Sequence, residues 1–405
     1  MTILGVAESV AASLVRAVAE APDRDAVAER FARAAWSRVA EPGDGDAGRL
    51  VASLGAERAL DAVMREADRD DGTAPVLGDE YAAAVARWRS RLGMPELLLA
   101  LRQAARFGAS LVIPSDPDWP TRLDDLGDNT PHALWVRGDR TVLGRLERSI
   151  AIVGARAATG YGEHVTVEAA AGLVDRGFAV ISGAAYGIDG VAHRAALASG
   201  GDTVAFLAGG VDRFYPAGHE QLLGRIVERG AVVSEVPCGV APSRWRFLQR
   251  NRLIAATAGA TVVVEAGWRS GSLNTAHHAL DLGRPVGVVP GPVTSSASAG
   301  CHRLLREAPV VCVTGAAEMA ELVPGAASER SWPEAPVDDR MSGTRTRLID
   351  ALSQRTARTP AALAAISGLA PDRIRAELGL LELEGAVRER PTGWVRARGS
   401  DTGPG

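Results

Sequence analysis

The chain has 405 residues, which predicts two or three domains at ~150 residues per domain. Apolar residues make up 46% and charged residues 23%, so disorder over the whole length is excluded. The formal net charge of −4 excludes a globally basic nucleic-acid binder, although it permits a local basic patch. The chain has no lysine, and all 45 of its Lys+Arg residues are arginine.

The cysteines and the N-terminal sequence indicate in which cellular compartment the protein is found. Cys238, Cys301 and Cys312 are odd in number and lack CxxC spacing, which argues against a disulfide framework or a zinc site. The N-terminus lacks the basic start and apolar run of a signal peptide, and no run of about 20 residues is free of charge and apolar throughout. We therefore expect a cytoplasmic protein that does not enter membranes.

Residues 1–107 show apolar residues at helical spacing, with breaks at 41–46 and 93–95. The sequence predicts an all-helical region here. Its helices could form a helix-hairpin-helix or SAM-like module that touches DNA. They could equally form a packing or oligomerisation cap, and the residues alone do not decide between these two interpretations.

Residues 108–322 alternate between short apolar runs and helical patterns, which predicts an α/β domain. Strands are expected at 109–113, 133–136, 150–153, 178–181, 203–208, 231–235, 261–265, 285–289 and 309–313. Helices are expected at 164–176, 191–199, 220–229, 248–257 and 275–282. Right-handed crossovers would make this an extended Rossmann-like, doubly wound parallel sheet. Ligands bind such sheets beyond the carboxyl ends of the strands.

Residues 323–342 are rich in Pro, Ser, Ala and acidic residues, which is typical of a linker. Helices at 344–354, 360–366 and 371–384, followed by two short strands around 391–393, predict a winged helix-turn-helix domain over residues 343–398. Arg373 and Arg375 could face DNA. Winged helices also serve as protein docking modules, so both interpretations remain open.

The first two loops at the carboxyl ends of the predicted strands are rich in glycine. Gly154 ends the strand at 150–153, and Arg156 lies in the turn that follows, where backbone N–H groups at a helix start could receive a phosphate. The next loop carries Ser182, Gly183 and Gly187. We expect Asp189 to cap its helix, and His193 to be a packed or capping residue rather than a base.

The third stretch, 243–252, interleaves basic and aromatic residues. Arg244, Arg246, Arg250 and Arg252 occur within nine residues without an acid. Arginines that contact phosphates, with aromatic faces that stack on bases, are typical of single-strand binding. The alternative is that the aromatics are core residues and the arginines form a solvated face. We expect Phe247 to stack and Trp245 to belong to the core.

The fourth loop, 265–276, offers hydroxyl and backbone donors at another helix start, from Ser270, Gly271, Ser272 and Thr275. A fifth loop at 289–293 should close the same edge. Several donor loops on one rim suit a ligand with several phosphates. Glu235 and Glu265 end strands, and we expect both to pair with arginines.

Catalytic motifs are poorly represented. Without lysine there is no Walker A motif, and HExxH and GxSxG are missing. A dinucleotide oxidoreductase is disfavoured because GxGxxG and the ribose-binding acid are missing. An enzyme that processes nucleotides or nucleoside phosphates remains the alternative to a binding protein. Release of the base on incubation with nucleoside monophosphates would favour that enzyme.

Five segments together resemble the DprA/Smf (DNA processing protein A) family: IAIVGARAATGYG, ISGAAYGIDGVAH, SEVPCGVAPSRWRFLQRNRLIA, VVVEAGWRSGSLNTAHHA and PVGVVPGPV. The resemblance covers about residues 110–322. It implies a homodimeric single-stranded DNA-binding protein, without enzymatic activity, metal or cofactor. Such a protein would protect incoming DNA and help to load the RecA recombinase during natural transformation.

The resemblance also carries residue roles. It makes Arg156 a phosphate anchor, and 247–252 the segment that stacks on bases and contacts phosphates. Leu248 stands where the family has proline, and Asn274 where it often has an apolar residue. The full predicted DNA-binding set is Gly154, Arg156, Ser182, Gly183, Gly187, Arg244, Arg246, Phe247, Arg250, Asn251, Arg252, Ser270, Gly271, Ser272 and Thr275.

Overall fold

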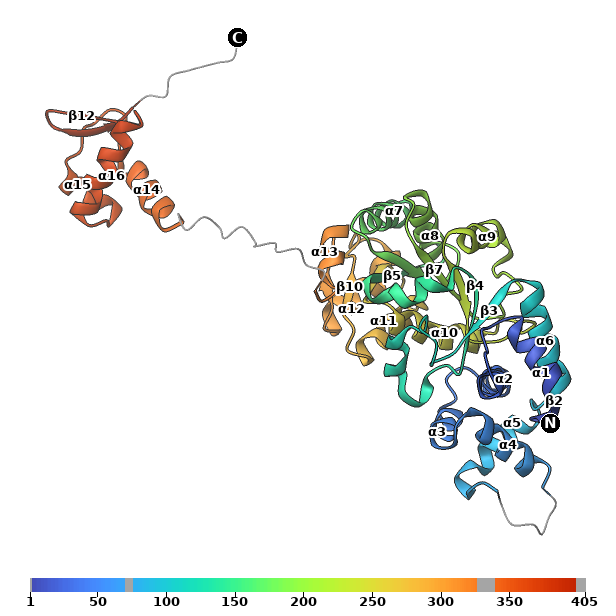
Figure 1. Cartoon of the computed structure of the whole chain (residues 1–405). Coiled ribbons are helices and arrows are strands. Elements are labelled where there is room, and N and C mark those ends of the chain that lie inside the picture. Colours follow the sequence, from blue (N-terminus) through green and yellow to red (C-terminus); the bar gives the residue numbers. More distant parts are fainter. Residues whose placement is uncertain (1, 70–75, 326–338, 398–405) are drawn as a thin grey trace. The chain divides into compact units, whose positions relative to one another are not determined.

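The computed structural model describes residues 2–69, 76–325 and 339–397. Two compact units are present, residues 1–327 and residues 328–405. The predicted helical region at 1–107 and the predicted sheet domain at 108–322 thus lie in one compact unit (Figure 1). Most of the predicted linker lies outside the described residues.

The N-terminal part of the first unit is helical apart from a short hairpin. Its elements are β1 (Thr2–Ile3), β2 (Val6–Ala7), α1 (Glu8–Arg16), α2 (Arg24–Val39), α3 (Gly45–Leu54), α4 (Ala56–Ala67), α5 (Ala82–Arg89) and α6 (Met94–Arg106). The hairpin corrects the all-helical prediction. Its turn is made by Leu4 and Gly5, which both have positive φ. The expected breaks at 41–46 and 93–95 fall at the junctions of α2 with α3 and of α5 with α6, although α3 begins at Gly45 and α6 at Met94, inside the predicted breaks.

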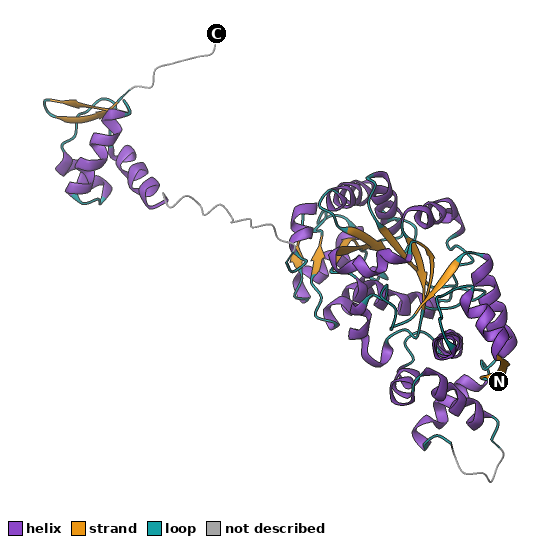
Figure 2. Cartoon of the chain, in the orientation of Figure 1, coloured by secondary structure: helices purple, strands orange, loops and turns teal. Residues whose placement is uncertain are grey.

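A nine-stranded sheet forms the centre of the first unit (Figure 2). Its strands are β3 (Ala109–Val112), β4 (Leu134–Gly138), β5 (Ser149–Gly154), β6 (Ala179–Ser182), β7 (Thr203–Leu207), β8 (Ala231–Ser234), β9 (Ala260–Glu265), β10 (Val286–Val288) and β11 (Val311–Cys312). Their spatial order is β11-β10-β9-β5-β6-β7-β8-β4-β3. All pairs from β11 to β8 are parallel, and β4 runs antiparallel to both its neighbours.

Helices cover both faces of the sheet, as the doubly wound prediction requires. They are α7 (Gly160–Val174), α8 (Ile188–Ala198), α9 (Glu220–Arg229), α10 (Arg244–Thr257), α11 (Ser272–Asp281), α12 (Ala299–Glu307) and α13 (Ala316–Glu321). On β5, Ile150 and Ile152 pack with α7 and α8, whereas Ala151 and Val153 pack with α10 and α11. Figure 1 shows α7 and α8 on one side of the sheet and α10 to α12 on the other. The predicted fold class is confirmed.

The strand order reverses beside β5. The chain runs from β5 through β6 and β7 to β8 in one direction, and then crosses back to add β9, β10 and β11 on the other side of β5. Helix α10 lies in this crossing connection. Loops on either side of such a reversal diverge and leave a crevice at the carboxyl ends of the strands.

The second unit has three helices and a hairpin in winged-helix order. These are α14 (Asp339–Ala351), α15 (Pro360–Ser367), α16 (Pro371–Leu383), β12 (Val387–Arg390) and β13 (Gly393–Arg396). Its core contains Leu348, Leu363, Ile374, Leu378 and Val387. The predicted winged-helix domain is confirmed. Arg375 forms an exposed ion pair with Asp372 on the same helix.

Trp135 on β4 joins the N-terminal helices to the sheet. Its side chain is fully buried in the cluster that contains α1, α2 and α6, and its Nε1 donates to Ser37 Oγ at 3.2 Å. We expect Trp135→Ala to lower the free energy of unfolding by about 3–5 kcal/mol, because it leaves a large cavity in this shared core. Urea denaturation measures the loss. A loss under about 1 kcal/mol would contradict the shared core.

Candidate functional site

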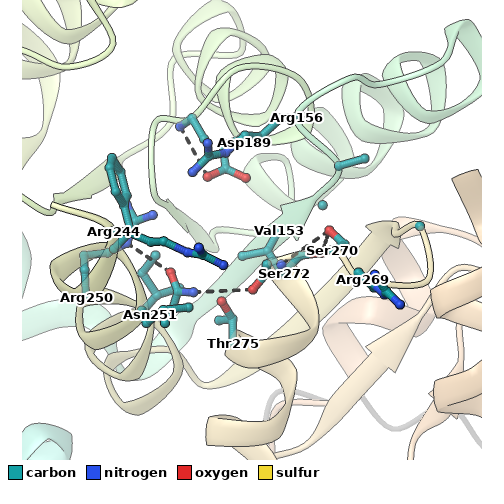
Figure 3. A pocket seen from close by; sticks show the side chains of 18 of the residues that line it. Val153, Arg156, Asp189, Arg244, Arg250, Asn251, Arg269, Ser270, Ser272 and Thr275 are labelled. Carbon is teal, nitrogen blue, oxygen red and sulfur yellow. Dashed lines mark hydrogen bonds between the residues drawn. The ribbon is translucent and has the colours of Figure 1, made fainter. Parts of the chain in front are cut away.

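A cavity of about 920 Å³ lies where the strand order reverses. Its wall includes Gly154 to Arg156 at the end of β5, Asp189 of α8, the first turns of α10, and residues 267–272 with Thr275 of α11. Figure 3 shows Arg156 and Asp189 on one side of this pocket, with Asn251 and Thr275 across from them. The elements are far apart in sequence, and the reversal beside β5 brings them together.

Arg156 and Phe247 meet in the cavity. The Arg156 guanidinium lies 5.4 Å from the centre of the Phe247 ring, within the range of a cation–π contact. The Arg156 side chain is exposed and makes no hydrogen bond or ion pair with any residue that the structure describes. Phe247 is half-buried and packs against Tyr215 with ring centres 5.6 Å apart. A stacking face and an unpaired cation are thus adjacent.

The start of α7 is not open to a phosphate, which corrects the interpretation of the first loop. Thr159 caps α7, and the Glu265 carboxylate accepts from its backbone N at 2.9 Å and its Oγ1 at 2.7 Å. A carboxylate of the chain therefore occupies the place expected for an anion. Glu265 also pairs with Thr159 rather than with an arginine, contrary to the prediction.

The second loop, residues 182–187, packs beneath the cavity wall. Ser182 is fully buried and donates to Ile152 O at 2.7 Å, and Gly183 lies against the Arg250 side chain. A Cβ on Gly183 would lie 2.2 Å from Arg250 Nη1, so glycine makes room for the guanidinium. Gly187 has a φ of +76°, and a Cβ there would meet the carbonyl oxygen of Ala155 at 2.2 Å. These residues shape the wall from buried or crowded positions.

Helix α8 carries two buried polar residues, Asp189 and His193, and only His193 has the role predicted from the sequence. Asp189 lies inside the first turn of α8, and its Oδ2 accepts from the backbone N of Gly183 and of Ala185 at 3.2 and 3.3 Å. Asp189 therefore holds the preceding loop in place. The prediction that it caps its own helix is wrong. His193 is fully buried, with Nδ1 2.7 Å from Thr203 Oγ1, which fits the packed role.

The basic and aromatic stretch belongs to a helix that begins earlier than predicted. Helix α10 begins at Arg244, and Ser243 caps it by accepting from Arg246 N at 3.3 Å. The sequence pattern predicts a start at residue 248, because the arginines and aromatic residues of the first turn do not show the apolar spacing that indicates a helix. The four arginines consequently project around a helix and have different surroundings.

Two of these arginines serve the fold, which corrects their assignment to direct DNA contact. Arg252 is 4% exposed, and its Nη1 donates to Glu235 Oε2 at 2.8 Å. Arg246 donates from Nε and Nη2 to the Glu41 carboxylate at 3.0 and 2.7 Å. The expected pairing of Glu235 with an arginine is confirmed. A buried or carboxylate-paired guanidinium has little capacity left for a phosphate.

Arg244 and Arg250 line the cavity. Arg244 is exposed, and its side chain has no hydrogen-bond or ion-pair partner among the described residues. Arg250 is 6% exposed and donates to Gly183 O at 2.7 Å. Burial lowers the pKa of Arg250 to about 10, which keeps it cationic at neutral pH. Burial raises the pKa of Asp189, and the Arg250 charge acts in the opposite direction.

The fourth loop forms the opposite wall. Ser270 Oγ and Ser272 Oγ lie 2.8 Å apart, and Thr275 one turn later is 2% exposed. Asn251 of α10 donates from Nδ2 to Gly271 O at 3.4 Å and to Asn274 Oδ1 at 3.2 Å. The polar Asn274 therefore has a partner in this chain. Asn251 is 8% exposed, so it acts mainly by tying α10 to this loop.

The predicted binding set lacks Trp268, Arg269 and Tyr215, which also line the cavity. Trp268 is 58% exposed, and the Arg269 side chain has no hydrogen-bond or ion-pair partner in the described part of the chain. For Trp268 and Arg269 the signal was an aromatic residue next to an arginine in an acid-free loop, the same pattern that singled out 243–252. The fifth loop at 289–293 does not line the cavity.

We expect Arg252→Met to lower the free energy of unfolding by about 3–5 kcal/mol, because it leaves Glu235 buried without its partner. Arg156→Met is the matched control and should change stability by less than ~0.5 kcal/mol, since Arg156 is exposed and unpaired. Chemical denaturation of the two variants gives the comparison. Equal stabilities would contradict the division between structural and cavity arginines.

Comparison with known proteins identifies the family. Residues 110–324 match the model described as DNA recombination-mediator protein A, and residues 332–393 match the DprA winged helix domain. A putative DNA processing protein DprA of Mycobacterium tuberculosis is 44% identical over 378 residues, which are 89% of this chain and 93% of that protein. The protein Smf of Escherichia coli is 34% identical over 326 residues, covering 74% and 85% of the two chains.

A solved structure shares the fold. The X-ray structure of DprA from Streptococcus pneumoniae matches with a TM-score of 0.56 and 28% identity, covering 70% of this chain and 93% of that one. Across the described residues, no helix is both long and apolar enough to cross a bilayer. The resemblance seen in the sequence is thus confirmed, and the chain belongs to the DNA recombination-mediator protein A (DprA/Smf) family of DNA processing proteins.

Proposed function

We propose that the chain binds single-stranded DNA in the cavity beside β5 and β9. The observation that carries this proposal is the set of unpaired cations, Arg156, Arg244 and Arg269. Among the described residues that line the cavity, Asp189 is the one acid, and its carboxylate accepts from backbone N–H groups. Arginines without acidic partners, facing one cavity, favour a polyanion.

The aromatic side chains favour an unpaired strand. Phe247 presents its ring inside the cavity beside Arg156, and Trp268 lies on the far wall. A base must leave its stack before it can lie against such a ring, and each stacked base contributes about 1–3 kcal/mol. A duplex keeps its bases stacked inside, so it could use the arginines but not the rings.

The lining favours binding over catalysis. No histidine, cysteine or glutamate lines the cavity in the described part of the chain. Asp189 is buried and already accepts two backbone hydrogen bonds. Hydrolysis of a nucleoside phosphate needs a base or nucleophile that can reach the ligand. These features support a non-enzymatic protein over the nucleotide-processing alternative.

We infer that the chain protects incoming single strands and helps to load the RecA recombinase during transformation, as a homodimer in the cytoplasm. The match to a family described as recombination mediators supports this role. A mediator must hold a strand and then release it, and contacts made chiefly to phosphates suit such reversible binding.

We expect Arg156→Ala to weaken single-strand binding by roughly 10-fold, because a hydrogen bond to a charged group contributes about 1.5–3 kcal/mol. The slope of log K against log salt should also fall by ~0.7, the value for one phosphate contact on a single strand. Fluorescence anisotropy at several salt concentrations measures both quantities.

The control is Arg225→Ala, which removes an exposed arginine of α9 outside the cavity. It should leave affinity and slope within error of the unaltered chain. If Arg156→Ala behaved like this control, the cavity would not be the DNA site.

The mediator role predicts faster RecA filament formation on single strands when the protein is present. Arg156→Ala should lose most of this acceleration, because the strand must be bound before it can be handed over. Filament formation can be followed by RecA ATP hydrolysis. An equal acceleration by the variant, at concentrations where it leaves DNA unbound, would contradict the role.

A further inference from the structure

Trp245 lies in a second cavity, although the sequence suggested a core residue. The Trp245 side chain is 55% exposed. It lines a cavity of about 400 Å³ together with residues 41–45, Trp88 and two arginines of the N-terminal region, Arg87 and Arg91. Pockets for small ligands have volumes of about 300–1,000 Å³. A large aromatic face here is therefore available to a ligand of modest size.

The turn at 41–45 is fixed against α10. The Glu41 carboxylate accepts two hydrogen bonds from Arg246, and it also pairs with Arg91. Burial acts to raise the pKa of Glu41, but Arg246 and Arg91 outweigh it and hold that pKa below its ordinary value. Gly43 has a φ of +78°, and a Cβ there would lie 2.3 Å from the Gln249 side chain. The wall opposite Trp245 is thus built into the fold.

The lining suits a nucleobase better than a phosphate. Its acids are occupied, because Asp44 accepts from Trp88 Nε1 at 2.9 Å and Glu41 is bound by two arginines. Its arginines are occupied too, because Arg87 pairs with Asp46 at 2.7 Å. What remains is a neutral pocket with an open indole face. A heteroaromatic base stacks on such a face without needing an ionic partner.

The second cavity and the main one are bordered by neighbouring residues at the start of α10. Arg244 lines the main cavity, and Trp245, the next residue, lines the second. Trp245 and Phe247 lie two residues apart, so they project about 200° apart around the helix. A strand that leaves Phe247 and reaches Trp245 must cross the first turn, where the unpaired Arg244 can contact a phosphate.

We propose that the cavity at Trp245 binds a base of the same single strand that occupies the main cavity. The N-terminal helices thereby extend the DNA site instead of serving only as a cap. This inference rests on the proposed function. It assigns Trp245 as a stacking residue and Arg246 as the residue that positions the opposite wall.

The test compares affinity across strand lengths. Oligothymidylates of about 4 to about 24 nucleotides bracket the sizes that single-strand sites occupy. We expect Trp245→Ala to bind the shortest strands like the unaltered chain, and longer strands about 5- to 150-fold more weakly. Trp245→Phe should retain most of the affinity for long strands. Thermal melting should be unchanged, because the side chain is exposed.

Arg156→Ala separates this inference from the proposed function. If Arg156→Ala weakens binding at every length while Trp245→Ala acts only on longer strands, both stand. If Arg156→Ala weakens binding but Trp245→Ala changes no length, or all lengths equally, the second site is refuted and the main site stands. If Arg156→Ala has no effect at any length, the proposed function is refuted, and the inference about Trp245 falls with it.

Discussion

The reversal of strand order beside β5 determines where this molecule can bind a ligand. The crossing from β8 to β9 carries α10 to the carboxyl edge of the sheet, next to the loop after β5. Loops that belong to one side of the reversal then face loops from the other side across an open cavity. Arg156 and Phe247 meet only because of this topology, since 90 residues of chain separate them.

The glutamates around the cavity are paired with other residues of the chain. The cavity is therefore cationic, although the net charge of the chain is negative. Glu235 pairs with Arg252, Glu41 pairs with Arg246, and Glu265 is bound by Thr159. Arg156, Arg244 and Arg269, which have no acidic partner among the described residues, line the cavity. Local charge of this kind attracts a polyanion whatever the overall charge of the protein. The pairs Glu235–Arg252 and Glu41–Arg246 also hold α10 in place, so the same contacts leave the cavity cationic and position the helix that lines it.

Most strands and helices were predictable because apolar runs of four to six residues alternate with helical patterns. The role of each arginine was not predictable from local sequence. Arg246 and Arg244 look alike in the stretch 243–252, yet Arg246 meets Glu41, which lies 205 residues away. Trp245 was misplaced in the core for the same reason. Trp268 and Arg269 carried a usable signal, an aromatic and an arginine in an acid-free loop, and were still missed.

Photo-crosslinking tests the central claim most directly. A single-stranded oligonucleotide that carries photoreactive bases is bound to the full chain and irradiated, and the crosslinked peptides are identified by mass spectrometry. The account predicts crosslinks in α10 around Phe247 and in the loop around Trp268, because these rings face the cavity. Crosslinks confined to the winged-helix unit or to the exposed faces of α7 and α9 would contradict it.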